Sequence, residues 1–343
     1  MSHDALLEIR DLDVIYRGRS MLGFQGKTFQ AVKGASLSIS AGETLGLVGE
    51  SGSGKSSIAN TVLGLVPASA GSIRFGDVDL ASMKTRYPPA VRGQIQAVFQ
   101  DPYSSLNPSM TVEDIVTEPL RVHTTMNRSE RRARAVELLK LVSLSEEHLS
   151  RHPHQFSGGQ RQRIAIASAL ALTPKLIVLD EPVSALDVST QNQIINLLYE
   201  RRNDLGIAYL LIAHDLALVH HISDRIAVMY LGHIIEEGPS DRVYLSPAHP
   251  YTKALLDAVP LLDPDAQRRR RAARRAAPLI DAPRVSAIGC PYRNRCPQAM
   301  PICAAEMPPA YPIAGGGRAN CFLHATEADP KIDSAELAGR AAL

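Results

Sequence analysis

Short apolar runs separated by polar turns divide the first three quarters of the chain into strands and helices. Residues 6–16 and 35–39 alternate apolar and polar side chains, which is typical of half-buried strands. Two runs that start at Leu45 and Leu176 are apolar throughout and end in polar turns, as central parallel strands do. Between them, the stretch of about residues 112–149 contains RSERRARAVELLKLVSL, which has the apolar spacing of an amphipathic helix. The pattern predicts an α/β domain with a mixed sheet at its core and a helical subdomain inserted between two strands.

The composition changes in the last quarter of the chain. Thirteen of the 23 prolines follow Arg242, together with an arginine-rich run, RRRRAARR, and all four cysteines. A segment with so many prolines and so few apolar runs buries too little surface to build a large core. We therefore divide the chain into an α/β domain over residues 1–255, with its helical subdomain at about 101–157, and an irregular extension over residues 256–343.

Composition and charge exclude several classes of protein. Hydrophobic residues make up 45% of the chain and charged residues 21%, as in soluble globular proteins and unlike disordered or collagen-like chains. The net charge of +2 provides no global field that would attract nucleic acid, so no nucleic-acid partner is expected. No apolar run approaches the roughly 18 to 20 residues of a membrane-spanning helix. The first residues, MSHDALLEIRDL, lack the apolar core of a secretory signal, and we expect a cytosolic chain.

A glycine-rich segment after the run from Leu45 carries the first chemical signal. The sequence GESGSGKS fits the pattern G-x-x-x-x-G-K-[ST] and lies between an expected strand and a helix expected from Ser56. Its glycines allow backbone amides to turn toward phosphate oxygens. We expect Lys55 to contact the β- and γ-phosphates of ATP and the Ser56 hydroxyl to bind Mg2+. The predicted nucleotide contacts of this segment are Gly49, Glu50, Ser51, Gly52, Ser53, Gly54, Lys55, Ser56 and Ser57.

Two acids complete the predicted phosphate site. Asp180 and Glu181 end the apolar run LIVLDE. Asp180 suits the coordination shell of Mg2+, and Glu181 suits a general base that activates water for attack on the γ-phosphate. Taken alone, two such acids could simply be solvated groups at the end of a strand. Their combination with a phosphate loop favours catalysis.

Four further features follow in a characteristic order along the chain. Gln100 ends an expected strand, Ser157 begins the sequence SGGQ ahead of an apolar helix, the sequence SALD ends at Asp187, and His214 ends the apolar run IAYLLIAH. Together with the two phosphate-binding segments, these features resemble the nucleotide-binding subunits of ABC transporters, with Walker A, Q-loop, signature, Walker B, D-loop and H-loop in family order. The chain departs from the family at Phe156, where the signature usually has leucine, a position that we expect to serve apolar packing.

The resemblance covers residues 6–255 and implies that two such subunits close head to tail on two ATP molecules. The catalytic residues that it implies are Glu181, His214, Lys55 and Gln100. For Mg2+ it implies Ser56, Gln100 and Asp180. It also implies nucleotide contacts from the signature and the D-loop, which are Ser157, Gly158, Gly159, Gln160 and Asp187. The signature residues would contact the ATP that is bound to the partner subunit.

The adenine ring is expected to stack on an aromatic side chain near the end of the first strand. Tyr16 matches the family position, and Phe29 is a rival. Because every group needed for hydrolysis is present, we expect this chain to contribute a complete catalytic set.

The resemblance also implies partners and a location. The partners are a second ABC ATPase subunit, either this chain itself or a paralogue, two transmembrane permease subunits and an extracytoplasmic solute-binding protein. The chain would lie at the cytoplasmic face of the cell membrane as a peripheral subunit, with residues 100–121 in contact with the permeases. The alternative is a soluble ABC-type ATPase of translation or DNA repair, which a single Walker A and an insert of ordinary size disfavour.

The extension looks like the tail of oligopeptide and dipeptide importers, through the segments AHPYTKALLDAVP, GCPYRNRCPQAMPIC and ANCFLH. This implies import of peptides or of related small solutes, including nickel. It also implies a four-iron four-sulfur cluster on the four cysteines. Their spacing, C-x5-C-x6-C-x17-C, lacks the close cysteine pairs usual for zinc, but Zn2+ and unligated buried thiols stay open. The cysteines are Cys290, Cys296, Cys303 and Cys321.

The arginine run, residues 268–275, has two interpretations. Each arginine near a membrane surface would gain about 1 kcal/mol from anionic lipid headgroups. A block of like charges is also typical of a solvated linker.

Overall fold

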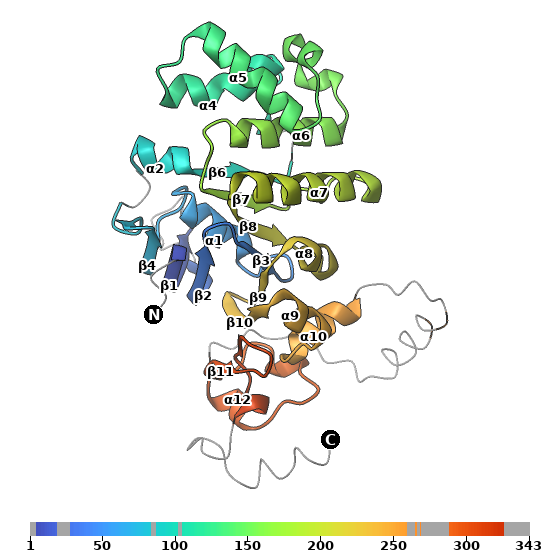
Figure 1. Ribbon diagram of the computed structural model, residues 1–343. Coiled ribbons are helices and arrows are strands. Elements are labelled where there is room, and N and C mark those ends of the chain that lie inside the picture. The colour runs from blue at the N-terminus through green and yellow to red at the C-terminus, as the bar shows by residue number, and fades with distance from the viewer. Residues whose placement is uncertain are drawn as a thin grey trace.

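The computed structural model describes residues 5–18, 28–83, 87–101, 105–258 and 288–325, with the isolated residues Asp265 and Arg268. A group of helices lies at one end of the molecule, a sheet with its covering helices lies in the middle, and the extension lies at the other end (Figure 1). In the part of the chain so described, no helix has the length and apolar character needed to cross a membrane. Of the arginine run, residues 269–275 lie outside the described residues.

An eight-stranded sheet forms the centre of the structure, in the strand order β11-β12-β10-β9-β3-β8-β7-β6. The five strands from β9 to β6 are parallel, and β10, β12 and β11 continue the sheet antiparallel. The apolar runs from Leu45 and Leu176 are parallel strands of this sheet, as predicted. The strands are β3 (Thr44–Val48), β6 (Ile95–Val98), β7 (Leu176–Asp180), β8 (Ala208–Ala213), β9 (Arg225–Tyr230), β10 (His233–Pro239), β11 (Tyr311–Pro312) and β12 (Arg318–Ala319).

A second, antiparallel sheet covers one face of the central sheet. Its order is β2-β1-β4-β5, with β1 at Ala5–Arg17, β2 at Thr28–Ser40, β4 at Ala70–Phe75 and β5 at Val78–Asp79. The strand expected at residues 35–39 is longer than its apolar alternation, because β2 pairs with β1 as far as Thr28. Leucine and isoleucine side chains of β1, β2 and β3 share one buried cluster with α1 (Lys55–Val62).

Helices cover the other face of the central sheet. At the upper end of Figure 1, α4 (Val112–His123) and α5 (Arg128–Leu141) lie over α6 (Gly158–Leu170). Helices α4 and α5 fall in the stretch of about 112–149 where the sequence predicts helix. Thr111 caps α4, and Asn127 and Glu130 form a capping box at α5. The exact limits of a helical subdomain stay a prediction. The remaining α-helices are α2 (Pro89–Gln94), α7 (Val188–Leu205), α8 (Leu216–Ile222), α9 (Ser240–Leu245), α10 (Pro250–Ala258) and α12 (Ile302–Ala305).

The described part of the extension, residues 288–325, packs directly against the central sheet. Strand β12 pairs with β10, and Phe322 and Tyr292 are buried in the same cluster as Tyr230 of β9. Apart from the four-residue α12, its elements are two-residue strands and single turns of 3-10 helix. It is therefore irregular, as expected, yet it shares the core of the domain and extends its sheet. The division at residues 255 and 256 stays a prediction.

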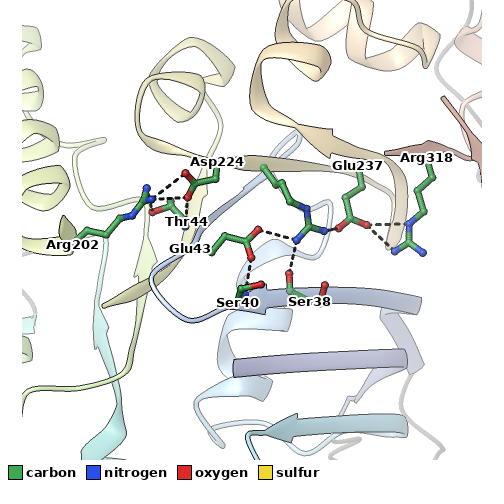
Figure 2. Close-up of polar contacts among 9 residues, drawn as sticks. Ser38, Ser40, Glu43, Thr44, Arg202, Asp224, Glu237 and Arg318 are labelled. Carbon is green, nitrogen blue, oxygen red and sulfur yellow. Dashed lines mark hydrogen bonds and ion pairs between the residues drawn. The ribbon is translucent and has the colours of Figure 1, made fainter. Parts of the chain in front are cut away.

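A chain of ion pairs ties both sheets and the extension together (Figure 2). Arg225, at the start of β9, donates to Glu43 at 2.8 Å and to the backbone carbonyl of Ser38 at 3.1 Å, and also pairs with Glu237 of β10. Arg318 of β12 donates two hydrogen bonds to the same carboxylate, at 3.0 and 2.7 Å. The Glu237 side chain is only 5% exposed, so one buried acid joins two strands that are far apart in sequence.

Candidate nucleotide site

The phosphate loop connects β3 to α1 and is held in a conformation that requires glycine. Gly54 has φ +111°, and a Cβ atom there would lie 2.3 Å from the carbonyl oxygen of Ala31. A Cβ atom at Gly49 would lie 2.1 Å from the carbonyl oxygen of Met229. Backbone from β2 and β9 therefore presses against the loop at two points, and a side chain at either position would displace it.

Lys55, the first residue of α1, is 5% exposed and points back along the loop. Its ammonium group donates to the carbonyl oxygens of Gly49 at 2.8 Å and Glu50 at 3.0 Å. Burial lowers the pKa of Lys55, and the charges of Glu181 and Asp180 oppose this shift. The two acids thus favour a charged lysine at the bottom of the loop, where an anionic phosphate would meet it.

Asp180 lies at the end of β7 and faces the first turn of α1. The hydroxyl of Ser56 donates to its carboxylate at 3.3 Å. Burial raises the pKa of Asp180, while the Ser56 hydrogen bond and the Lys55 charge lower it. The structure therefore brings together the hydroxyl and the carboxylate that the sequence assigns to Mg2+.

Glu181 receives the two other predicted catalytic side chains on one oxygen. Gln100, after β6, donates to its Oε2 at 3.0 Å, and Nδ1 of His214, after β8, lies 3.5 Å from the same atom. Glu181 has φ +48°, a left-handed conformation that is uncommon for a residue with a side chain. Residues that follow three different strands, β6, β7 and β8, therefore meet at one carboxylate oxygen of Glu181.

Lys55, Ser56, Gln100, Glu181 and His214 line one hollow of about 500 Å3, and Asp180 adjoins it through its hydrogen bond with Ser56. The structure brings Lys55, Gln100, Glu181 and His214 together, and their catalytic roles stay predictions. The residues that line the hollow are Phe29, Ala31, Ser51, Gly52, Gly54, Lys55, Ser56, Ser57, Gln100, Glu181 and His214.

The two aromatic candidates for adenine stacking lie side by side. Tyr16 of β1 pairs across the sheet with Phe29 of β2. Phe29 is 61% exposed and lines the hollow, whereas Tyr16 is 37% exposed and its hydroxyl bonds to Ser57 at 3.2 Å. The geometry gives Phe29 at least as good a position as Tyr16, and the choice of Tyr16 stays a prediction.

The SGGQ segment does not line this hollow. Ser157 caps α6, and its hydroxyl accepts a hydrogen bond from the Gln160 backbone at 3.3 Å. A Cβ atom at Gly159 would lie 2.4 Å from Thr190, whose backbone N–H donates to Asp187 at 2.9 Å. Hydrogen bonds from Thr190 lower the pKa of Asp187. Residues 157–160 and Asp187 therefore form a separate surface, and Phe156 beside them is buried, as expected.

Sequence reasoning missed two residues that contact the phosphate loop from outside the hollow. The hydroxyl of Tyr251 in α10 accepts a hydrogen bond from the Glu50 backbone N–H at 2.9 Å. Arg295, in the extension, pairs with the Glu50 carboxylate. These residues are 201 and 245 positions from Glu50, and although both lie in the segments that resemble importer tails, nothing in those segments indicates a contact with the phosphate loop.

The four cysteines are free thiols and lie in the same part of the extension. The Cys290 backbone N–H donates to the Cys303 carbonyl at 2.8 Å. Burial raises the pKa of Cys290 to about 11 and that of Cys321 to about 12, and neighbouring cysteines add to both shifts. Among the described residues, however, no three His, Cys, Asp or Glu side chains are arranged to hold a metal ion. The expected iron–sulfur cluster therefore finds no support in the structure, and neither does Zn2+.

The fold and the hollow define an ATPase of the phosphate-loop type with a separate SGGQ surface. Two family models match the chain, one described as ABC transporter over residues 32–184 and one described as oligopeptide/dipeptide transporter, C-terminal region, over residues 235–303. The chain belongs to the ABC transporter ATPases, in the group that carries the oligopeptide/dipeptide transporter C-terminal region.

Curated relatives and solved structures agree with this assignment. The oligopeptide transport ATP-binding protein OppF of Salmonella typhimurium is 49% identical over 88% of this chain and 92% of its own length. The putative oligopeptide transport ATP-binding protein YkfD of Bacillus subtilis is 46% identical over 87% and 91%. The dimeric ATP-binding cassette MJ0796 bound to ADP and Pi has a TM-score of 0.59 at 29% identity, covering 68% of this chain and 98% of its own.

Proposed function

We propose that this chain is the ATP-hydrolysing subunit of a membrane importer for peptides or related small solutes. The observation that carries the proposal is the hollow lined by the phosphate loop, Gln100, Glu181 and His214, beside which Asp180 is hydrogen-bonded to Ser56. The names of the similar proteins support peptides as the transported class. OppF and YkfD are both named for transport, which gives no support to the alternative of a soluble ATPase in translation or DNA repair.

Within the hollow, each side chain has a role that follows from its contacts. Lys55 is held beneath the loop and would bind the β- and γ-phosphates of ATP. Ser56 and Asp180 offer a hydroxyl and a carboxylate in contact with each other, a donor set that fits Mg2+. When bound, Mg2+ would neutralise phosphate charge, and Gln100 is proposed to contribute to its shell.

Glu181 is proposed to hold and deprotonate the attacking water. Its carboxylate is partly buried and is oriented by the Gln100 amide, so a water bound to it has a fixed direction. His214, whose side chain is 60% exposed, would contact the γ-phosphate and the same water. The nucleotide would be held by Tyr16 or Phe29 on its base and by residues 49–57 on its phosphates.

The SGGQ surface is proposed to complete the ATP site of a second ATPase subunit. Ser157, Gly158 and Gly159 begin α6, where backbone N–H groups and the helix dipole favour an anion. These three residues do not line the hollow that contains Lys55, which supports a role at the ATP of a second subunit. Gln160 and Asp187 would lie in the same interface. The similar MJ0796 cassette is described as dimeric.

The importer would include two transmembrane permeases, an extracytoplasmic solute-binding protein and a second ATPase subunit. This chain would lie at the cytoplasmic face of the membrane, and its residues 100–121 would contact the permeases. Affinity purification of the tagged chain from detergent-solubilised membranes tests this assembly. We expect stoichiometric membrane subunits in the complex and uptake of labelled peptide that depends on Lys55. Consistent recovery with ribosomes or DNA would refute it.

For the cysteines, we propose a structural role in the extension. Four thiols within electrostatic reach of one another are the donor set that an iron–sulfur cluster uses, but among the described residues their placement does not form a ligand group. Iron, sulfide and zinc analysis of protein purified without oxygen distinguishes the cases. About four irons per chain would support an iron–sulfur cluster on the cysteines. If no iron, sulfide or zinc is found, the cysteines are unligated buried thiols.

A further inference from the structure

Three groups fix Glu50, the residue that follows the first glycine of the phosphate loop. Tyr251 accepts a hydrogen bond from its backbone N–H at 2.9 Å, and Lys55 donates to its carbonyl at 3.0 Å. The third contact comes from the extension, where Nη1 of Arg295 donates to both carboxylate oxygens of Glu50 at 3.0 and 3.1 Å. The backbone and the side chain of Glu50 are therefore both held, and two of the three partners come from the last third of the chain.

Arg295 is itself firmly positioned. It ends a turn of 3-10 helix, Arg293–Arg295, and its backbone N–H donates to the carbonyl of Tyr292 at 2.9 Å. Its guanidinium group lies 5.9 Å from the ring centre of Tyr230 and 5.6 Å from that of Tyr292. Such cation–π contacts favour the charged group in that position.

The aromatic rings connect this arginine to the other partner of Glu50. Tyr251 packs against Tyr230 at 4.5 Å and against Tyr292 at 5.4 Å between ring centres. Tyr230 ends β9, Tyr251 belongs to α10 and Tyr292 belongs to the extension. One aromatic cluster therefore supports both contacts with the phosphate loop.

We propose that Arg295 is a positioning residue for ATP, through which the extension holds the phosphate loop in its binding conformation. The inference rests on the proposed role of residues 49–57 as the phosphate site. Two physical effects would follow from the contact. A loop that is ordered beforehand loses less conformational freedom when the nucleotide binds. The guanidinium also neutralises the Glu50 carboxylate, which would otherwise repel the anionic phosphates.

The expected effect is on affinity and not on the chemical step. Arg295 touches none of Lys55, Glu181 and His214 in the described contacts, so removing it leaves the reacting groups in place. The ion pair is partly exposed, with side-chain exposures of 37% and 44%, which limits its strength. For Arg295→Ala we expect the Kd for nucleotide to rise about threefold to fivefold, the upper part of the range for an exposed ion pair.

The experiment measures the Kd of the full-length chain for Mg2+ and a non-hydrolysable ATP analogue by calorimetry. Arg295→Lys should weaken binding less than Arg295→Ala, because lysine keeps the charge and loses only the planar guanidinium that lies near Tyr230 and Tyr292. The exchanged pair Glu50→Arg with Arg295→Glu should recover part of the affinity lost in Arg295→Ala, because it restores the ion pair but not the cation–π contacts of position 295. Arg293→Ala is the matched control, since Arg293 lies in the same turn and donates to the carbonyl of Ile288 instead of to the loop.

Two further measurements separate positioning from general stability. In the ATPase assay, KM for ATP should rise while kcat at saturating ATP stays within about twofold of wild type. This pattern results when a mutation weakens binding of the ground state and of the transition state equally. The difference between Arg295→Ala and wild type should shrink at high salt, which screens an exposed ion pair. If Arg295→Ala does not fold, the lysine variant and the exchanged pair carry the same comparison.

An unchanged Kd in Arg295→Ala would overturn the inference. It would also be overturned if Arg295→Ala weakened nucleotide binding as much in a Glu50→Ala background as in the wild-type chain, because Arg295 would then act without Glu50. The proposed phosphate site fails in a different way. It is wrong if the wild-type chain does not bind the analogue, or if Lys55→Ala binds it as tightly as wild type does.

Discussion

Replacing Glu237 by glutamine tests how strongly the extension is joined to the sheet. The carboxylate is 5% exposed and pairs with Arg225 and Arg318, whose side chains are 31% and 42% exposed. Breaking a fully buried pair costs about 3–5 kcal/mol because it leaves a charge uncompensated. Here the cost is smaller, since both guanidiniums reach solvent and each keeps another acceptor, Glu43 for Arg225 and the carbonyl of Ser36 for Arg318. We expect Glu237→Gln to lower the free energy of unfolding by about 1–2 kcal/mol.

The assay is denaturation in urea, combined with hydrogen exchange of the backbone amides in β10 and β12. Because β12 has only two residues and pairs with β10, loss of the ion pairs should raise exchange there before it raises exchange in β3 or β8. Glu200→Gln is the control, as Glu200 is 62% exposed and its loss should cost no more than about 0.5 kcal/mol. A change in Glu237→Gln no larger than that of the control would refute the reasoning.

Three more outcomes follow from the contacts. Glu181→Gln should reduce ATP turnover by at least about 100-fold while nucleotide binding persists, and undiminished turnover would reject the assigned base. Gly54→Ala should abolish nucleotide binding, because its Cβ meets a carbonyl oxygen 2.3 Å away at φ +111°; calorimetry checks this. Burial, and next the His324 charge, lowers the pKa of His249 from 6.5 to about 3. Between these two pH values the unfolded chain binds a proton at His249 and the folded chain does not, so the free energy of unfolding should fall as pH drops from 6.5 toward 3. His249→Asn, which keeps an acceptor for the Tyr251 N–H and removes the titration, should flatten this pH dependence of the urea midpoint.

The nucleotide site was largely predictable because its chemistry lies in contiguous motifs. A phosphate loop needs glycines and a lysine at fixed spacing, and the strands before it and before Glu181 are continuous apolar runs. Family order assigned Gln100 and His214 to the same ATP site as Glu181, and the structure places both beside its carboxylate. The choice between Tyr16 and Phe29 was less certain, since two paired strands bring both rings to one edge of the site.

The extension was much harder to interpret from the sequence. The two-residue strands β11 and β12 are too short to show an alternating pattern, so their addition to the central sheet was not predicted. The resemblance of the cysteine segment implied a metal cluster, yet the described thiols form no ligand group. A shared cysteine spacing fixes which donors are available, whereas ligation also depends on how the loops between them pack.

The sequence by itself determined the α/β class, the phosphate loop, the acid pair at residues 180 and 181 and the membership of a transporter ATPase family, because each depends on short local motifs and, for the family, on their order along the chain. Only the tertiary structure decided that Glu237 joins Arg225 to Arg318 and that Arg295 reaches Glu50. The paired atoms in the second contact are 245 positions apart. Such contacts leave no periodic or motif signal, since they arise when separate elements pack on a common core.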